Sequence, residues 1–262
     1  MDLGLKDKVT VITAASGGLG YAIAKEFAAE GAKVVIAARD AGKLEAAQTT
    51  LRQATGATVE AIRADCTRGD DIDSLVRETE RRFGCIDVLI ANSGGPPNKP
   101  FTELTDADWH AVFDVKLLPQ IRSCRAVMPG MQRRKQGRIV IINGTHGKSP
   151  HTYALTAGIT NAALLNLTKV LSEVGAPDNI LVNAINPGPI ETDRMRYVVH
   201  QKAVELGISD VEAKRLVCAD IPLGRFGEPE DIAAAAAFLA SSRAGHITGA
   251  LFDIDGGITR AI

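Results

Sequence analysis

Short β-branched runs that alternate with longer segments of helical period predict an α/β fold, in which a parallel sheet carries helices on both faces. The alternation runs through all 262 residues without an internal repeat, a low-complexity linker or a charge block. Parallel strands need crossover helices, and right-handed crossovers produce a doubly wound sheet that binds ligands at the carboxyl ends of its strands. We therefore expect a single domain over residues 1–262, with binding residues that follow strands.

Seven apolar runs carry the β-branched side chains that favour strands. They span residues 9–13, 33–37, 58–62, 87–91, 138–142, 180–185 and 250–254. Between them, side chains such as Ile72, Leu75, Val76 and Thr79 recur at spacings of three and four, which indicates helices with one buried face. This order predicts a Rossmann-type, doubly wound parallel sheet of about seven strands.

The composition excludes several classes of protein. With 45% hydrophobic residues, 25 Gly, 11 Pro and four Cys, the chain is not collagen-like, disordered or a disulfide scaffold. A net charge of -1, from 30 basic and 31 acidic residues, gives no field for nucleic acid and no polybasic membrane anchor. The longest apolar stretch, residues 232–240, is too short to span a membrane. We expect a cytoplasmic protein with reduced cysteines.

One long interval between strands, residues 187–249, is a candidate for a ligand cover. Its part 191–224 is polar, is interrupted by Gly207 and Pro222, and follows directly on a strand end. Insertions at such places commonly close over a ligand, although an inert surface excursion is the alternative. We expect residues 191–224 to form a substrate lid.

A Gly-rich turn follows the first strand and leads into a helix that starts at about Leu19. Glycines at such a turn let backbone amides approach a pyrophosphate, and the helix N-terminus favours its negative charge. A tight turn without a ligand is the alternative. The candidate cofactor residues here are Thr13, Ser16, Gly17, Gly18, Leu19 and Gly20.

Arg39 follows the second strand, where dinucleotide folds discriminate the adenosine ribose. No acid stands at Ala38 to bind a free 2′-hydroxyl, whereas Arg39 offers a bidentate partner for a 2′-phosphate. A merely solvated Arg39 is the alternative. The sequence therefore favours NADP(H) over NAD(H).

With these features the chain resembles the short-chain dehydrogenase/reductase family, and in particular its 3-oxoacyl-ACP reductase-like members, over nearly its whole length. The turn at 13–20 is similar to the family's Thr-Gly-x-x-x-Gly-x-Gly, with Ala14 in place of the first Gly, and segments 225–232 and 247–257 resemble its C-terminal core. The resemblance implies an adenine contact at Asp65 and a nicotinamide contact around Thr192. It adds these candidate cofactor residues: Asp65, Cys66, Asn92, Gly94, Pro187, Gly188, Ile190 and Thr192.

The catalytic positions depart from the family. Its members use a Tyr as proton donor, a Lys four residues later, a Ser that holds the substrate oxygen and an Asn that orders a relay water. Aligned without gaps on segments 113–117, 137–142 and 161–169, these positions hold Ala157, Asn161, Gly144 and Lys116, respectively. Tyr153 could be aligned with the Tyr instead, but Ala157 would then stand at the Lys position. Because Ala and Gly side chains cannot donate a proton, the usual mechanism does not carry over.

Replacements for the missing acid lie nearby in the sequence. Lys116 could donate a proton or bind an anionic group if burial lowers its pKa, and a surface Lys is the alternative. His146 and Tyr153 are further catalytic candidates, and Asn161 could orient the nicotinamide ribose. His146 and His151 lack a third ligand at useful spacing, so we expect no metal.

Three functions are compatible with this pattern. The first is an NADP(H)-dependent oxidoreductase that acts on a carbonyl/alcohol or imine substrate through a non-standard site; a protonated imine needs less proton assistance than a ketone. The second is an inactive NADP(H)-binding sensor or regulatory subunit. The third, a structural partner, gives no reason for Arg39, Asp65 and Thr192 to occur together. The resemblance also implies a homodimer or homotetramer and a small-molecule substrate.

Overall fold

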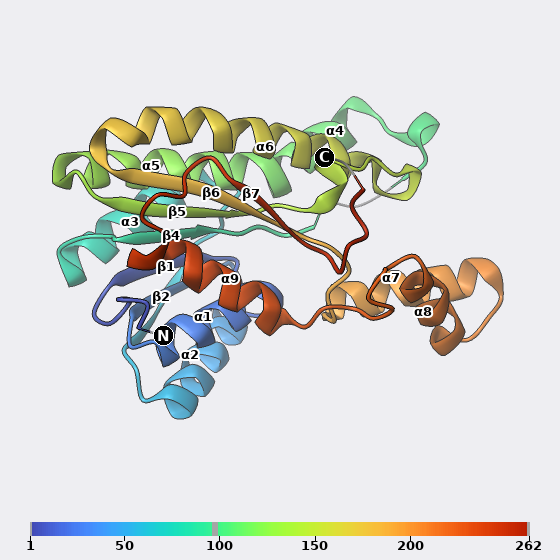
Figure 1. Cartoon of the computed structure of the whole chain (residues 1–262), viewed down its shortest axis with the longest axis horizontal. Coiled ribbons are helices and arrows are strands. Elements are labelled where there is room, and N and C mark those ends of the chain that lie inside the picture. Colours follow the sequence, from blue (N-terminus) through green and yellow to red (C-terminus); the bar gives the residue numbers. More distant parts are fainter. Residues whose placement is uncertain (1, 96–98, 261–262) are drawn as a thin grey trace.

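Seven parallel strands form one sheet in the order β3-β2-β1-β4-β5-β6-β7 in the computed structural model of the chain (Figure 1). The structure describes residues 2–95 and 99–260, apart from the side chain of Tyr153. The predicted fold class is confirmed, because the order reverses between β1 and β4 as in a doubly wound sheet. The strands are β1 (Val9–Thr13), β2 (Lys33–Ala38), β3 (Val59–Arg63), β4 (Val88–Ala91), β5 (Gly137–Ile142), β6 (Ile180–Pro187) and β7 (Leu251–Ile254).

Helices cover both faces of this sheet, as the sequence predicts (Figure 1). One face packs on α1 (Gly18–Ala29), α2 (Ala41–Thr55) and α9 (Pro229–Ala240). The other face packs on α3 (Gly69–Phe83), α5 (Leu118–Arg134) and α6 (Leu155–Gly175). Adjacent residues of one strand therefore enter different cores: Ile12 lies in the first and Val11 in the second. This two-sided burial explains why the central strands are nearly continuous apolar runs, whereas the edge strands β3 and β7 carry Glu60 and Asp253.

The helix ends follow local chemistry. The Asp40 carboxylate accepts a hydrogen bond from the backbone of Lys43 and caps α2, which ends at Gly56 with a φ of 67°. Helix α3 carries Asp70 in its first turn and Arg82 in its last, so both charges complement the helix dipole. These ends fix where each helix meets the sheet.

A π-helical turn, Phe113–Leu117, joins α4 (Asp106–Val112) to α5. The capping box between Thr105 and Asp108 fixes the start of α4. Turns of this kind are rare and occur frequently at functional sites. Lys116 lies in this turn and is buried.

Two further helices, α7 (Asp193–Leu206) and α8 (Asp210–Ala219), project from the sheet as a hairpin (Figure 1). They occupy most of the expected lid, residues 191–224, and Gly207 ends α7 with a φ of 66°. The hairpin has its own small core, made of Val199, Ala203, Ala213, Ile221 and Phe226. The lid segment is therefore a packed helical unit attached at its two ends.

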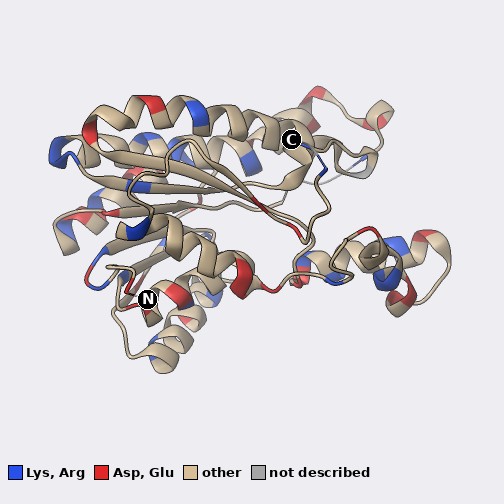
Figure 2. Cartoon of the chain, viewed as in Figure 1, with Lys and Arg blue, Asp and Glu red and all other residues tan. Residues whose placement is uncertain are grey.

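Acidic and basic side chains are mixed along the ribbon, and the α7–α8 hairpin carries both signs (Figure 2). Among residues 2–95 and 99–260, no helix has the length and apolar character that a membrane span requires. The charge distribution agrees with the near-zero net charge of the sequence.

Candidate active site

The Gly-rich turn is tied to the end of β4. The Thr13 hydroxyl donates a hydrogen bond to the carbonyl of Asn92 at 2.6 Å and accepts one from the backbone amide of Asn92 at 2.9 Å. The Asn92 carboxamide in turn donates to the carbonyl of Ala14 at 3.3 Å. Thr13 and Asn92 thus hold the shape of the turn.

Two residues of the turn show why glycine is needed there. A methyl group on Gly20 would lie 2.5 Å from the carbonyl oxygen of Ala14, so α1 can approach the turn only with a glycine. Ala14 itself adopts a φ of 50°, the left-handed region in which a Cβ is strained. The sequence shows that Ala14 replaces the family's first glycine, and the structure shows that the backbone keeps the conformation a glycine favours.

The start of α1 is open. Gly17 and Gly18 have no described atom within 4 Å of the position that a Cβ would take, and no described side chain caps the first turn of the helix. Its amide groups therefore remain available to an anion. The site of the turn fits a pyrophosphate.

A cavity of about 200 Å³ brings this turn together with the segment after β6, because both Gly18 and Thr192 line it. Thr192 caps α7 by accepting a hydrogen bond from the backbone of Met195 at 3.3 Å. Gly188 lies so close to β7 that a Cβ on it would be 2.6 Å from the Cβ of Asp255. Two of the predicted cofactor segments therefore face one cleft.

At the adenosine end, Arg39 is exposed just after β2. The pKa of the Asp65 carboxyl lies below its usual value, chiefly because the backbone of Thr67 donates to it, and Arg39 contributes to the lowering. Burial raises the pKa of the Cys66 thiol to about 11, so this residue is neutral and unreactive. Arg63, a residue that the sequence analysis did not select, donates to the carbonyl of Arg39 at 3.1 Å.

Lys116 is 8% exposed, and its ammonium donates a hydrogen bond to the carbonyl of Asn143 at 3.2 Å. Burial alone lowers the pKa of Lys116 from 10.5 to about 8. The sequence left open a surface Lys at this position, and the structure places the side chain inside. A buried amine with this pKa exchanges protons near neutral pH.

Asn143 belongs to a chain of polar side chains that runs from the buried Asn143 and Asn186 to the exposed Asp253. Its carboxamide donates to the Asn186 side-chain oxygen at 3.0 Å, and the Asn186 carboxamide donates to Asp253 at 2.7 Å. Lys148 pairs with the same Asp253 carboxylate at 2.8 Å. Lys148, in the loop after β5, is thus engaged with β7. Asn143 and Asn186 were missed, because the sequence shows only a polar residue at the end of a strand.

The loop after β5 lies directly on α6. A methyl group on Gly147 would be 2.8 Å from the backbone of Asn161, and one on Gly144 would be 2.6 Å from the Asn161 carboxamide nitrogen. Asn161 is 3% exposed, and its backbone carbonyl accepts from the Asn143 carboxamide at 3.2 Å. The structure therefore brings Lys116, Asn143, Gly144 and Asn161 into one cluster.

The remaining candidates lie in the same loop. The rings of His146 and His151 are 6.5 Å apart, and burial lowers the pKa of His146, which is therefore neutral at physiological pH. Tyr153 lies in the 3₁₀ turn Thr152–Ala154, and its side chain falls outside the described part of the chain. Within the described residues, no group of three or more His, Cys, Asp or Glu side chains is arranged to hold a metal ion.

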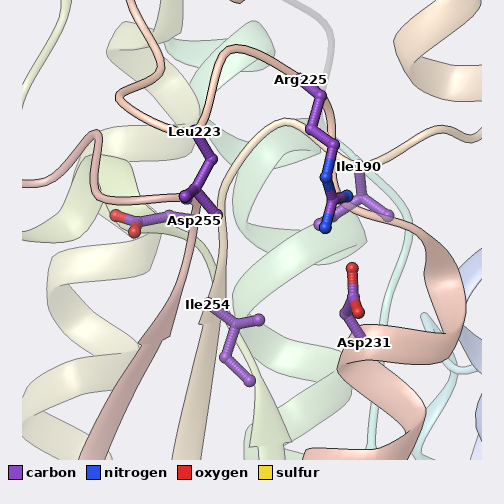
Figure 3. A pocket seen from close by; sticks show the side chains of 8 residues that line it. Ile190, Leu223, Arg225, Asp231, Ile254 and Asp255 are labelled. Atoms are coloured by element: carbon purple, nitrogen blue, oxygen red, sulfur yellow. The ribbon is translucent and has the colours of Figure 1, made fainter.

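A separate cavity of about 310 Å³ lies where the lid segment returns to the sheet (Figure 3). In Figure 3 the Arg225 side chain extends into it from the loop, toward Asp231 on α9. Ile190 pairs with Gly227 as an isolated bridge beside this cavity. The base of the lid is therefore fastened next to the predicted nicotinamide segment.

Known proteins share both the sequence pattern and this architecture. Residues 13–259 match the family described as enoyl-(acyl carrier protein) reductase. Galactitol 2-dehydrogenase of Agrobacterium fabrum is 32% identical, over 97% of this chain and 98% of its own. The 3-oxoacyl-[acyl-carrier-protein] reductase FabG of Aquifex aeolicus is 31% identical, over 98% of this chain and 100% of its own.

Among solved structures, L-sorbose reductase of Gluconobacter frateurii, complexed with NADPH and L-sorbose, superposes with a TM-score of 0.95. It is 32% identical, and the match covers 100% of both chains. The family match, the relatives and the shared fold agree with one another along the whole sequence. The chain belongs to the short-chain dehydrogenase/reductase family of oxidoreductases.

Proposed function

We propose that the protein is an NADP(H)-dependent oxidoreductase that acts on a carbonyl/alcohol or imine substrate with a catalytic site different from that of most of its family. The observation that carries this proposal is the cleft in which the open turn at Gly18 meets Thr192. A structural partner without a ligand would not need an open helix start or a buried Lys116 with a pKa near 8. NADPH-bound relatives of the same fold support the choice of cofactor.

Three segments that follow strands would hold the dinucleotide, and of their residues Gly18 and Thr192 line the cavity described above. The amides of Gly18 and Leu19 at the start of α1 would bind the pyrophosphate. Arg39 would bind the 2′-phosphate, and Asp65 would contact the adenosine. Thr192 and the 187–190 segment would hold the nicotinamide, which supplies or accepts the hydride when bound.

Lys116 would take the role of the missing Tyr. In the reducing direction its ammonium would give a proton to the substrate heteroatom, and the neutral amine would recover a proton from solvent. Because burial sets the pKa of Lys116 at about 8, we expect the rate of reduction to fall as pH rises through about 8. In the oxidising direction the neutral amine is the active form, so the pH dependence is reversed.

We propose that the α7–α8 hairpin closes over the substrate, because it is attached beside the nicotinamide segment and packs mainly on itself. We also propose a homodimer or homotetramer formed through helices such as α6, whose Ile159, Val170 and Val174 side chains are about half exposed. The cysteines of the described chain are free thiols, which supports a cytoplasmic location.

The test is a fluorescence titration with NADPH and, in parallel, NADH. NADPH should bind at least about tenfold more tightly, which corresponds to about 1.4 kcal/mol. Turnover of Lys116→Met should then be lost while its NADPH affinity is retained. Binding of NADPH without any turnover of the unmodified protein would favour the sensor, and failure to bind either cofactor would refute both functions.

A further inference from the structure

The Asn161 carboxamide fills the space that the family's Ser side chain would occupy. A Cβ on Gly144 would lie 2.6 Å from the Asn161 nitrogen, closer than non-bonded atoms can approach. The two differences from the family, at positions 144 and 161, therefore concern the same space. The loop has lost a side chain there, and the carboxamide of Asn161 on α6 occupies the volume. This substitution could not be read from the sequence, in which the two residues are far apart.

Several contacts hold the backbone of Asn161 in place beside the loop. The Asn143 carboxamide nitrogen donates hydrogen bonds to the Asn161 backbone carbonyl and to the Asn186 side-chain oxygen. The Asn143 amide therefore cannot be flipped, because its oxygen would then face two acceptors. Asn186 is itself fixed, since its nitrogen must donate to the Asp253 carboxylate. The loop and α6 are thereby joined at the site, with the Lys116 ammonium bound to the backbone carbonyl of the same Asn143.

The two atoms of the Asn161 carboxamide differ in their surroundings. Its oxygen is buried and has no hydrogen-bond partner among the residues that the structure describes. Its nitrogen is the atom that lies nearest to the position that a Cβ on Gly144 would take, so it occupies the space beside the family's Ser position. An N–H group in this position can donate just as the hydroxyl would.

The geometry points to Asn161 as the hydrogen-bond donor that holds the carbonyl oxygen of the substrate, in place of the family's Ser. This inference rests on the proposed oxidoreductase function, and it names a ketone or aldehyde as the substrate class. Asn161 and Lys116 would have complementary roles: the amide would polarise the substrate carbonyl, and the ammonium would protonate the oxygen of the product.

The reaction balances with these groups. The carbonyl carbon receives a hydride, which is one proton with two electrons, from the reduced nicotinamide, which becomes oxidised. The electron pair of the C=O π bond moves to the oxygen, where Asn161 donates a hydrogen bond to the developing negative charge. The oxygen then takes a proton from Lys116, and an alcohol is formed.

Three NADPH-dependent assays with cyclohexanone, 2,3-hexanedione and ethyl acetoacetate test the assignment. We expect at least one probe to be reduced by the unmodified protein. Asn161→Asp, which keeps the shape but cannot donate when ionised, and Asn161→Leu should each lower kcat by about 10²- to 10³-fold. The control Gln53→Glu, the matching amide-to-acid change at an exposed position of α2, should leave kcat unchanged.

A rescue experiment uses the shared space directly. Asn161→Ala should lose activity, and Gly144→Ser in that background restores a hydroxyl where the amide was removed, so kcat should recover at least about tenfold. The NADPH dissociation constant of each variant, from cofactor fluorescence, should stay within about threefold of the unmodified protein. A melting curve of each variant confirms that it is folded.

Several results would overturn the assignment. They are retained kcat in Asn161→Asp, no recovery in the double variant, or weaker NADPH binding with unchanged kcat, which would mean that Asn161 holds the ribose. The proposed function fails in a different way: the unmodified protein then either binds no NADPH or binds it without reducing any probe. The two failures are distinguishable, because the Asn161 variants are compared only if the unmodified protein reduces a probe.

Discussion

Replacing Lys116 by Met should make the protein more stable at neutral pH. Burial lowers the pKa of Lys116 from 10.5 to about 8, and each unit corresponds to about 1.4 kcal/mol, so the charged side chain costs about 3 kcal/mol at pH 7. Loss of the hydrogen bond to the Asn143 carbonyl offsets about 1 kcal/mol of this gain. We expect Lys116→Met to raise the free energy of unfolding by about 2 kcal/mol at pH 7.

The sign of the pH dependence follows from proton binding. Between pH 8 and 10.5 the unfolded chain holds the Lys116 proton while the folded protein has released it, so the stability of the unmodified protein rises with pH in this window. The advantage of Lys116→Met should therefore shrink by about 2 kcal/mol between pH 7 and 9.5.

Urea unfolding at a series of pH values measures this difference. Lys43→Met, at an exposed position on α2, is the matched control and should show no such pH dependence. If the difference between Lys116→Met and the unmodified protein stays constant from pH 7 to 9.5, the burial argument is wrong.

Three further predictions concern the cofactor turn and Arg39. Ala14→Gly should stabilise the protein by up to about 1 kcal/mol in urea unfolding, because Ala14 adopts a φ of 50°; a loss of stability would contradict this. Gly20→Ala should lower the free energy of unfolding by about 1 to 3 kcal/mol and weaken NADPH binding, because its Cβ would lie 2.5 Å from the Ala14 carbonyl oxygen. The Cβ of Gly17→Ala meets no described atom within 4 Å, so this control variant should fold normally. Arg39→Ala should weaken NADPH binding at least about tenfold in a fluorescence titration, as loss of a charged hydrogen bond does, and an equal loss of NADH binding would argue against contact with the 2′-phosphate.

The sheet and its cofactor side could be predicted because they depend on local pattern. Parallel strands buried on two faces must be continuous apolar runs, and β1 through β7 lie within a few residues of the predicted ranges. The helices α7 and α8 were not predicted, since the lid packs only a few residues of each helix and leaves side chains such as Val211 exposed. A polar segment that is interrupted by Gly207 and buries few side chains gives little helical signal in the sequence.

On the catalytic side, the sequence predicted the missing groups and named candidate replacements, but it did not predict how these residues are arranged. The sequence showed which residues were missing at Gly144 and Ala157, but burial of Lys116 depends on how the π-helical turn packs against α6 and meets the loop after β5. The chain from Asn143 to Asp253 joins residues on different strands, so no spacing reveals it. Contacts of this kind are set by distances between elements, and these distances are not encoded in any local motif.

The close fit of Gly144 against Asn161 also affects how this lineage can change. A mutation that brings back the loop side chain alone would overfill the space, and a mutation that removes the amide alone would leave the site without either group. Each first step lowers fitness if the site is used, although the two steps together need not. Single substitutions can therefore accumulate in the lid and on the surface. A return to the family's usual catalytic residues requires coupled substitutions at positions 144 and 161.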